Sequence, residues 1–168
     1  MVLTKSELLA SLKNEVRILL HLAGKIDRAH IDYRPTEKQR STLELLRYLS
    51  FMGPMLIRMA NGHTDFAAWS AAQKEADTRD FDQTVRTIAS QAQVYETLLA
   101  GMSDDAFRVE VDNFDGSKTS RGVFIVKYVL QGHAAYRTQL FLYLKSCGCH
   151  ELNTRNLWGG VDAPAMTA

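Results

Sequence analysis

The chain has 168 residues, 46% of them apolar, which is enough to bury a full hydrophobic core in one domain. Its 20 basic and 19 acidic side chains nearly cancel, so no strongly basic field is available to hold a nucleic-acid backbone. Charged residues or histidine interrupt every apolar run well before the roughly 18 residues of a membrane span. The composition therefore predicts a folded domain with neither nucleic acid nor a membrane as its partner.

The N-terminal stretch and the cysteines bear on the cellular compartment. Residues 1–9 include an early glutamate and no small-residue cleavage site, so they do not resemble a signal peptide, and we expect a cytoplasmic location. Cys147 and Cys149 lie two apart, with His150 next. We interpret them as two thiols at a helix end in a reducing compartment, with a soft-metal ligand pair as the alternative.

The first helix is predicted over residues 5–27. Thr4 and Glu7 form a capping box, in which each side chain satisfies a backbone amide at the helix start. Residues 28–40 follow as a connector that contains Pro35, which blocks a continuous helix. Apolar residues recur at helical spacing along the first helix: Leu8, Leu12, Val16, Leu19, Ala23 and Ile26.

A second capping box, Ser41 with Glu44, opens a helix that runs to Asn61-Gly62. Within it, Gly53-Pro54 predicts a kink or a break, because proline removes one backbone hydrogen bond and clashes with the preceding turn. A short extra helix is expected over residues 65–74, and another long one from Asp80 to about Gly101.

Residues 103–118 have a different pattern. Phe107, Val109 and Val111 alternate with charged residues, as in a strand, and Asp115-Gly116 is a turn signal. A small extended excursion or hairpin is therefore expected before the last long helix.

That last helix is predicted from Thr119 to Gly148. Its core-facing stripe is expected to contain Ile125, Val129, Gly132, Tyr136, Leu140 and Tyr143. The middle of the helix also carries His133 and Arg137, close to Gly132 and Tyr136. Packing alone does not readily explain these residue types within six positions. This helix is the first place to look for a functional site.

The elements predict an all-α protein, a four-helix bundle forming a single domain over residues 1–168. The bundle should cover about 5–147. Residues 148–162 contain Leu157 and Trp158, so this segment should pack on the bundle or on a second subunit, and 163–168 should be a frayed tail.

In the order and spacing of four motifs, the chain resembles the DinB-like superfamily of bacterial four-helix-bundle proteins. The resemblance covers most of residues 5–162. The motifs are Arg34-Pro35-Thr36, the stretch 41–49 that opens the second long helix, Tyr136-Arg137-Thr138-Gln139-Leu140, and Leu152-Asn153-Thr154 with Leu157-Trp158.

The resemblance implies a divalent-metal site, often for nickel or zinc, built from three histidines inside the bundle. One belongs to the second helix and two, four residues apart, to the last, where they share one helix face. In this chain the three positions fall on Tyr48, Gly132 and Tyr136. We therefore predict that the metal site is absent and that a pocket lined by the two tyrosines persists, with space left by the glycine.

Two functions follow from the resemblance. The first is a cofactor-free module that binds a small-molecule ligand or a partner through this pocket or through a dimer surface. The candidate pocket residues are Tyr48, Gly132, His133, Tyr136, Arg137 and His21. The second is a metal-dependent hydrolase or thiol transferase, which would hold zinc or nickel through an unusual set drawn from His21, Glu15, His133 and Tyr48.

Individual residues keep alternative interpretations. His133 is either a ligand or a helix-flank histidine with a hydrogen-bonding neighbour. Arg137 either contacts an anion at the pocket or forms a salt bridge to an acid on a neighbouring helix. Trp158 and Leu157 would suit a homodimer interface.

Overall fold

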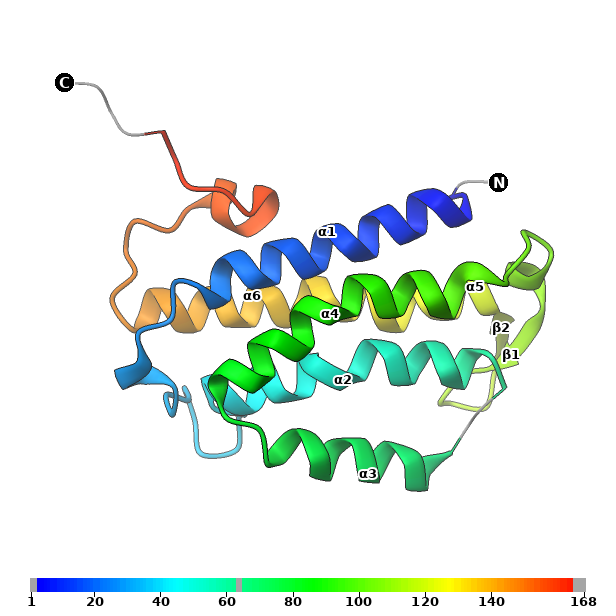
Figure 1. Cartoon of the computed structure of the whole chain (residues 1–168), viewed down its shortest axis with the longest axis horizontal. Coiled ribbons are helices and arrows are strands. Elements are labelled where there is room, and N and C mark those ends of the chain that lie inside the picture. Colours follow the sequence, from blue (N-terminus) through cyan, green and yellow to red (C-terminus); the bar gives the residue numbers. More distant parts are fainter. Residues whose placement is uncertain (1–2, 63–64, 165–168) are drawn as a thin grey trace.

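Four long helical rods form the body of the computed structural model, which describes residues 3–62 and 65–164 (Figure 1). The α-helices are α1 (Lys5–Ala23), α2 (Thr42–Ala60), α3 (Phe66–Asp77), α4 (Phe81–Ala100), α5 (Arg121–Phe124) and α6 (Gln131–Ser146). Short 3-10 turns form η1 (Arg28–His30) and η2 (Ala106–Arg108), and π-helical turns form η3 (Ile125–Leu130) and η4 (Arg155–Gly159). The strands are β1 (Glu110–Asp112) and β2 (Lys118–Ser120).

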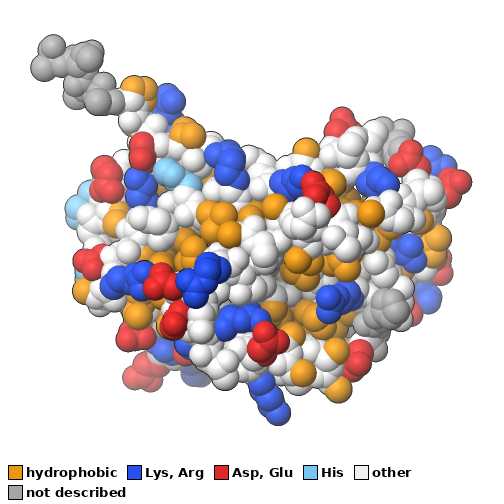
Figure 2. Space-filling model, in the orientation of Figure 1, with side chains coloured by type: hydrophobic (Ala, Val, Ile, Leu, Met, Phe, Trp, Pro, Cys, Tyr) orange, Lys and Arg blue, Asp and Glu red, His pale blue; other side chains and the backbone are white. Residues whose placement is uncertain are grey.

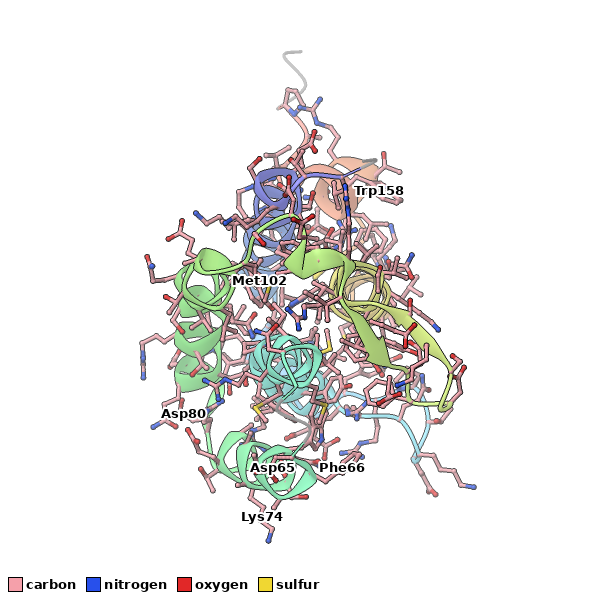
Figure 3. The ribbon with its side chains drawn as sticks, turned by 90° about the vertical axis from the view of Figure 1, so that its right-hand side faces the viewer. Asp65, Phe66, Lys74, Asp80, Met102 and Trp158 are labelled. Atoms are coloured by element: carbon pink, nitrogen blue, oxygen red, sulfur yellow. The ribbon has the colours of Figure 1, made fainter. Side chains whose placement is uncertain are left out.

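The rods are α1, α2, α4 and the continuous run of α5, η3 and α6. Helix α1 packs on α4 and α6, and α2 packs on the same two helices from the other side. Helix α3 lies against α2, outside the four rods (Figures 1 and 3). The prediction of an all-α bundle with a short extra helix and a small extended excursion is confirmed.

Capping boxes open three of the rods. Those at Thr4 and Ser41 form as predicted, and Asp80 forms a third with Gln83. The first helix ends at Ala23, four residues before the predicted end at 27. Its end coincides with Gly24, a poor helix former, and Asp27 then caps the separate turn η1 by accepting a hydrogen bond from the Ala29 amide.

The predicted disruption at Pro54 does not break α2, which is helical from Thr42 to Ala60. A side chain from the next rod supports the backbone here, because Nε2 of buried Gln91 donates a 2.8 Å hydrogen bond to the Leu49 carbonyl. The carbonyl that loses its helical donor to Pro54 is that of Ser50, so the bond from Gln91 joins α4 to α2 beside the proline and does not replace the missing bond.

The excursion between α4 and α5 is a small hairpin. Strands β1 and β2 are antiparallel, with Glu110 opposite Ser120, and Gly116 in the turn has φ of +79°. The predicted alternation placed Phe107 in this strand, and that is wrong: Phe107 belongs to η2, where its ring is only 9% exposed and packs into the core. The free energy gained by burying the Phe107 ring favours the turn over the strand that the short alternating pattern predicts.

The buried stripe of the last rod contains Ile125, Val129, Leu140 and Tyr143 as predicted, but it is displaced by one residue in the middle of the helix. It passes through Ile125, Val129, His133, Arg137 and Leu140, whereas Gly132 and Tyr136 are only half-buried. The rod is π-helical over 125–130, and four-residue steps through this turn carry the interior face to His133. One residue is about 100° around a helix, so Tyr136 is turned away from the centre of the bundle.

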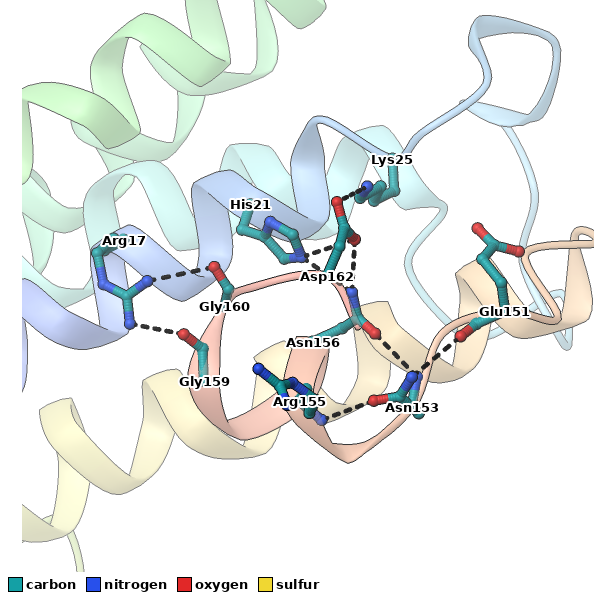
Figure 4. A network of polar contacts seen from close by, with 10 residues as sticks. All are labelled: Arg17, His21, Lys25, Glu151, Asn153, Arg155, Asn156, Gly159, Gly160 and Asp162. Atoms are coloured by element: carbon teal, nitrogen blue, oxygen red, sulfur yellow. Dashed lines mark hydrogen bonds and ion pairs between the residues drawn. The ribbon is translucent and has the colours of Figure 1, made fainter. Parts of the chain in front are cut away.

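The segment after α6 folds back on α1 (Figure 4). The Arg17 guanidinium donates hydrogen bonds to the carbonyls of Gly159, at 2.8 Å, and Gly160, at 3.2 Å. Gly160 has φ of +56°, and a Cβ there would come within 3.0 Å of the Ile18 backbone, so the close approach requires glycine. Of the predicted tail, 165–168 lies outside the described residues.

The surface view shows side chains of both charge signs interspersed, with apolar patches between them (Figure 2). Among the residues that the structure describes, no helix is both long enough and apolar enough to cross a bilayer.

Candidate functional site

An aromatic pocket of about 470 Å³ lies between α2, α3 and the last rod. Tyr48 is at its centre: its ring centroid is 5.1 Å from that of Tyr136 and 6.4 Å from that of Trp69, all in edge-on arrangements. The remaining lining residues are Met52, Leu56, Phe114, Lys127, Tyr128, Gln131, Gly132 and Ala135. Hereafter we call this the aromatic pocket.

Local sequence explains why space remains here. Gly132 contributes no side chain to the wall, and a Cβ built on it would lie 3.0 Å from the Met52 Cε atom. A larger residue would therefore require the flexible end of the Met52 side chain to move. The one-residue offset of the last rod leaves Tyr136 at the pocket wall instead of in the core.

The electrostatics of the pocket favour a neutral hydroxyl beside positive charge. Burial, together with neighbouring Tyr136, raises the pKa of Tyr48 to about 12, so this hydroxyl stays protonated near neutral pH. The Arg40 guanidinium lies 4.0 Å from the centre of the Tyr48 ring, and Lys127 lines the pocket. The pocket can stack a flat apolar group, donate a hydrogen bond and tolerate negative charge.

The donor set does not fit the divalent-metal site that the fold's resemblance implies. The three positions supply two phenols and a glycine, and the raised pKa of Tyr48 works against the phenolate that a metal would need. Within residues 3–62 and 65–164, no three side chains among His, Cys, Asp and Glu are arranged to hold an ion. The alternative set of His21, Glu15, His133 and Tyr48 is not brought together.

His133 does not line the aromatic pocket and instead faces α4. Its Nε2 atom shares a 2.6 Å hydrogen bond with the hydroxyl of Tyr95 on α4, and both side chains are buried. Burial, reinforced by nearby Arg137, lowers the pKa of His133 to about 4, so the imidazole is neutral near pH 7. A Cβ on Gly53 would lie 2.0 Å from the Tyr95 hydroxyl, so this glycine makes room for the pair.

Arg137 lies deeper than a pocket residue. Its Nε atom is 3.0 Å from a carboxylate oxygen of Glu15 on α1. The two groups form an ion pair, but the Arg137 Nε–H does not point at the oxygen, so they do not form a hydrogen bond. The guanidinium also donates to the Leu157 carbonyl and lies 5.4 Å from the centre of the Trp158 ring. Burial raises the pKa of Glu15, and the positive charge of Arg137 opposes that rise. Arg137 thus ties the last rod to α1 and η4.

His21 belongs to the contact between α1 and the C-terminal segment (Figure 4). Its Nε2 atom is 3.1 Å from the Asn156 side-chain nitrogen and 3.7 Å from Asp162, which also pairs with Lys25 at 2.8 Å. Of the six candidate residues, the structure therefore places Tyr48, Gly132 and Tyr136 in one pocket. It places His133, Arg137 and His21 at three other contacts.

Sequence reasoning missed Trp69, Tyr128 and Phe114 as pocket residues. Trp69 and Phe114 come from the extra helix and the hairpin turn, and nothing in a single sequence shows that these excursions return to the same cavity. It also missed Tyr95 as the partner of His133. In the sequence, Tyr95 lies at helical spacing with Ile88 and Leu99, and a tyrosine hydroxyl on a buried helix face needs a hydrogen-bonding partner. This need was the signal that could have identified the pair.

Comparison with solved structures finds the same fold in the crystal structure of a DinB-like protein, YjoA, from Bacillus subtilis. The TM-score is 0.67 at 17% sequence identity, over 87% of this chain and 94% of the other. No protein-family model matches the chain, and no curated protein matches it significantly. An identity this low shows the fold alone.

Proposed function

The chain has the DinB-like fold, and we propose that on this fold it acts as a small-ligand-binding protein through the aromatic pocket. One observation carries the proposal: Tyr48 and Tyr136, which the resemblance assigns to metal-ligand positions, line a cavity of about 470 Å³, within the size range of small-molecule sites. Its wall combines ring faces and edges with few polar groups, the lining typical of such sites.

The ligand class follows from that lining. Edge-on rings at Tyr48, Tyr136 and Trp69 favour a flat aromatic group, since ring pairs gain attraction beyond burial of area. The protonated Tyr48 hydroxyl and the Lys127 ammonium favour a hydrogen-bond acceptor or a carboxylate on that ring. A small aromatic acid meets both requirements.

Tryptophan fluorescence gives a direct test, because only two tryptophans are present and only Trp69 lines the pocket. Figure 3 shows Trp158 on the opposite side of the molecule from α3, which carries Trp69. In a Trp158→Phe variant, 4-nitrobenzoate should quench Trp69 saturably, whereas Tyr136→Ala in that background should weaken the quenching about tenfold, the loss of one ring contact. The non-aromatic control cyclohexanecarboxylate, followed by calorimetry, should bind more weakly.

Two results would overturn the proposal. One is quenching that rises linearly with ligand and is unchanged by Tyr136→Ala, which indicates collisions in solution. The other is one zinc or nickel ion per chain in untagged, freshly purified protein, measured by elemental mass spectrometry, which would favour the hydrolase or transferase alternative.

We further propose that the protein forms a homodimer through η4. Trp158 is 68% exposed and Val161 is 43% exposed, although both belong to a segment otherwise tied to α1. Exposed aromatic side chains are enriched at interfaces. Light scattering should give twice the chain mass, and Trp158→Asp should give the monomer mass; a wild-type monomer across working concentrations excludes the interface.

A further inference from the structure

A second, larger cavity lies at the other edge of the last rod, between the start of α1 and the α5–η3 turn. Its volume is about 810 Å³, and its lining surface is mainly apolar, with Leu3, Leu8, Val123 and Val126 as the aliphatic residues. Leu8, 3% exposed, and Phe107, 9% exposed, form the floor, while Val123, 54% exposed, lies at the rim. Hereafter we call this the aliphatic groove; it shares only Lys127 and Gln131 with the aromatic pocket.

The charges around the groove are unbalanced. Lys5, Arg108 and Lys127 line it, against the single acid Asp104. Lys5 donates to the Met102 carbonyl at 2.9 Å, and Arg108 is 3.7 Å from Asp105. Among the described residues, Lys127 has no carboxylate within ion-pairing distance. The lining therefore carries an excess of positive charge that favours an anion, with Asp105 beside Arg108 and Asp115 acting on Lys127 as the acids an anion would compete with.

The wall that carries Lys127 is itself unusual. Residues 125–130 form a π-helical turn, a geometry that is rare and frequently found at functional sites. Val126 and Lys127 are successive residues of this turn, and they give the same wall an apolar and a positive part.

We propose that the aliphatic groove binds a small amphipathic carboxylate, such as a medium-chain fatty acid. The chain would lie along Leu8, Phe107 and Val126, and the carboxylate would lie near Arg108 and Lys127. The volume is within the range of small-molecule sites. The aliphatic lining selects a flexible chain over a ring, and the excess of cations selects an anion over a neutral or cationic head group. This site is independent of the proposed function of the aromatic pocket.

The test uses three probes of equal chain length: decanoate, 1-decanol and decyltrimethylammonium. Calorimetry on the full chain should show saturable binding of one decanoate, at least fivefold weaker binding of decanol and no binding of the cation. Affinity for decanol equal to that for decanoate would overturn the selection for an anion, and no saturable decanoate binding would overturn the site.

Matched variants locate the binding. Val123→Asp and Val123→Lys both remove the same exposed apolar side chain but differ in charge. The aspartate should weaken decanoate about tenfold relative to the lysine, and Arg108→Ala should weaken it about threefold, as expected for exposed charges. Arg86→Ala on α4 lines neither cavity and should leave the affinity unchanged.

Three further measurements distinguish binding in the aliphatic groove from binding elsewhere. Tyr136→Ala alters only the aromatic pocket and should leave decanoate binding intact. If Tyr136→Ala abolished decanoate binding while Val123→Asp did not, decanoate would bind in the aromatic pocket, and the proposal would be overturned.

Light scattering with and without decanoate should give the same mass. A dimer that dissociates on adding decanoate would mean that a second copy of the chain fills the groove. If Val123→Asp loses the helical circular-dichroism signal, Arg108→Glu at an exposed position supplies the same charge test.

Discussion

His133 and Tyr136 lie three residues apart on α6, yet they experience opposite environments. His133 is 1% exposed and faces α4, where Tyr95 and Gly53 leave space for one hydrogen bond. Tyr136 is half-buried and lines a cavity with room for a further molecule. His133 and Arg137 on the interior face contact partners within the chain, whereas Tyr136 on the pocket face contacts Tyr48 and also borders open space. Variants on the first face should change stability, and variants on the second should change binding.

Removing the acid that neutralises Arg137 should have the largest effect on stability. Glu15→Leu leaves the Arg137 guanidinium, 3% exposed, without its carboxylate, which should lower the free energy of unfolding by about 3 kcal/mol or more. Urea denaturation at pH 7 measures the loss. The double variant Glu15→Leu, Arg137→Met should recover part of it, because both charges are then gone. A loss below about 0.5 kcal/mol in Glu15→Leu would mean that the pair is solvated and that Arg137 is available for ligands.

The second-largest loss of stability should come from filling the space beside Tyr95. A Cβ at Gly53 lies 2.0 Å from the Tyr95 hydroxyl, so Gly53→Ala should destabilise the protein by about 2 kcal/mol through overpacking, despite the better helix propensity of alanine. Tyr95→Phe removes the clashing oxygen. Thermal melts of the two single variants and the double variant should show that the second substitution lessens the effect of the first. Additive losses would contradict this contact.

The sequence was sufficient to predict where the four rods lie. It was not sufficient to predict which of these substitutions would destabilise the protein most. Capping boxes and apolar spacing gave the starts of α1 and α2, because those signals are local. In the middle of α6 the buried positions are His133 and Arg137, one residue after the predicted Gly132 and Tyr136, because the π-helical turn at 125–130 shifts the phase there, whereas Leu140 and Tyr143 are buried as predicted. Trp69 and Phe114 reach the pocket through tertiary packing, which a periodic pattern does not contain. The metal-ligand positions came from a family resemblance, and they indicated the cavity through Tyr48, Gly132 and Tyr136.

The neutral state of His133 gives a smaller effect that depends on pH. Its folded pKa, about 4, is below the usual value of 6.5, so between these values the unfolded chain binds more protons. Stability from this group is therefore present above pH 6.5 and is lost as pH falls towards 4, by about 2 kcal/mol between pH 7 and 5. The difference in unfolding free energy between wild type and His133→Gln isolates this contribution. A difference that does not change with pH would show that His133 is accessible to protons in the folded protein.

The smallest stability change should come from the pocket face, where binding should respond instead. Tyr136→Phe removes a hydroxyl from a half-buried ring and keeps the 5.1 Å contact with Tyr48, so the free energy of unfolding should change by no more than about 0.5 kcal/mol. Affinity for 4-nitrobenzoate should fall a few-fold, because one donor is lost while ring stacking remains. His133→Gln is the matched comparison at the neighbouring position that faces α4, and it should change stability without changing this affinity. If Tyr136→Phe instead destabilised the protein by more than about 1 kcal/mol with unchanged affinity, the aromatic pocket would be part of the structural core, and the contrast between the two faces of α6 would not hold.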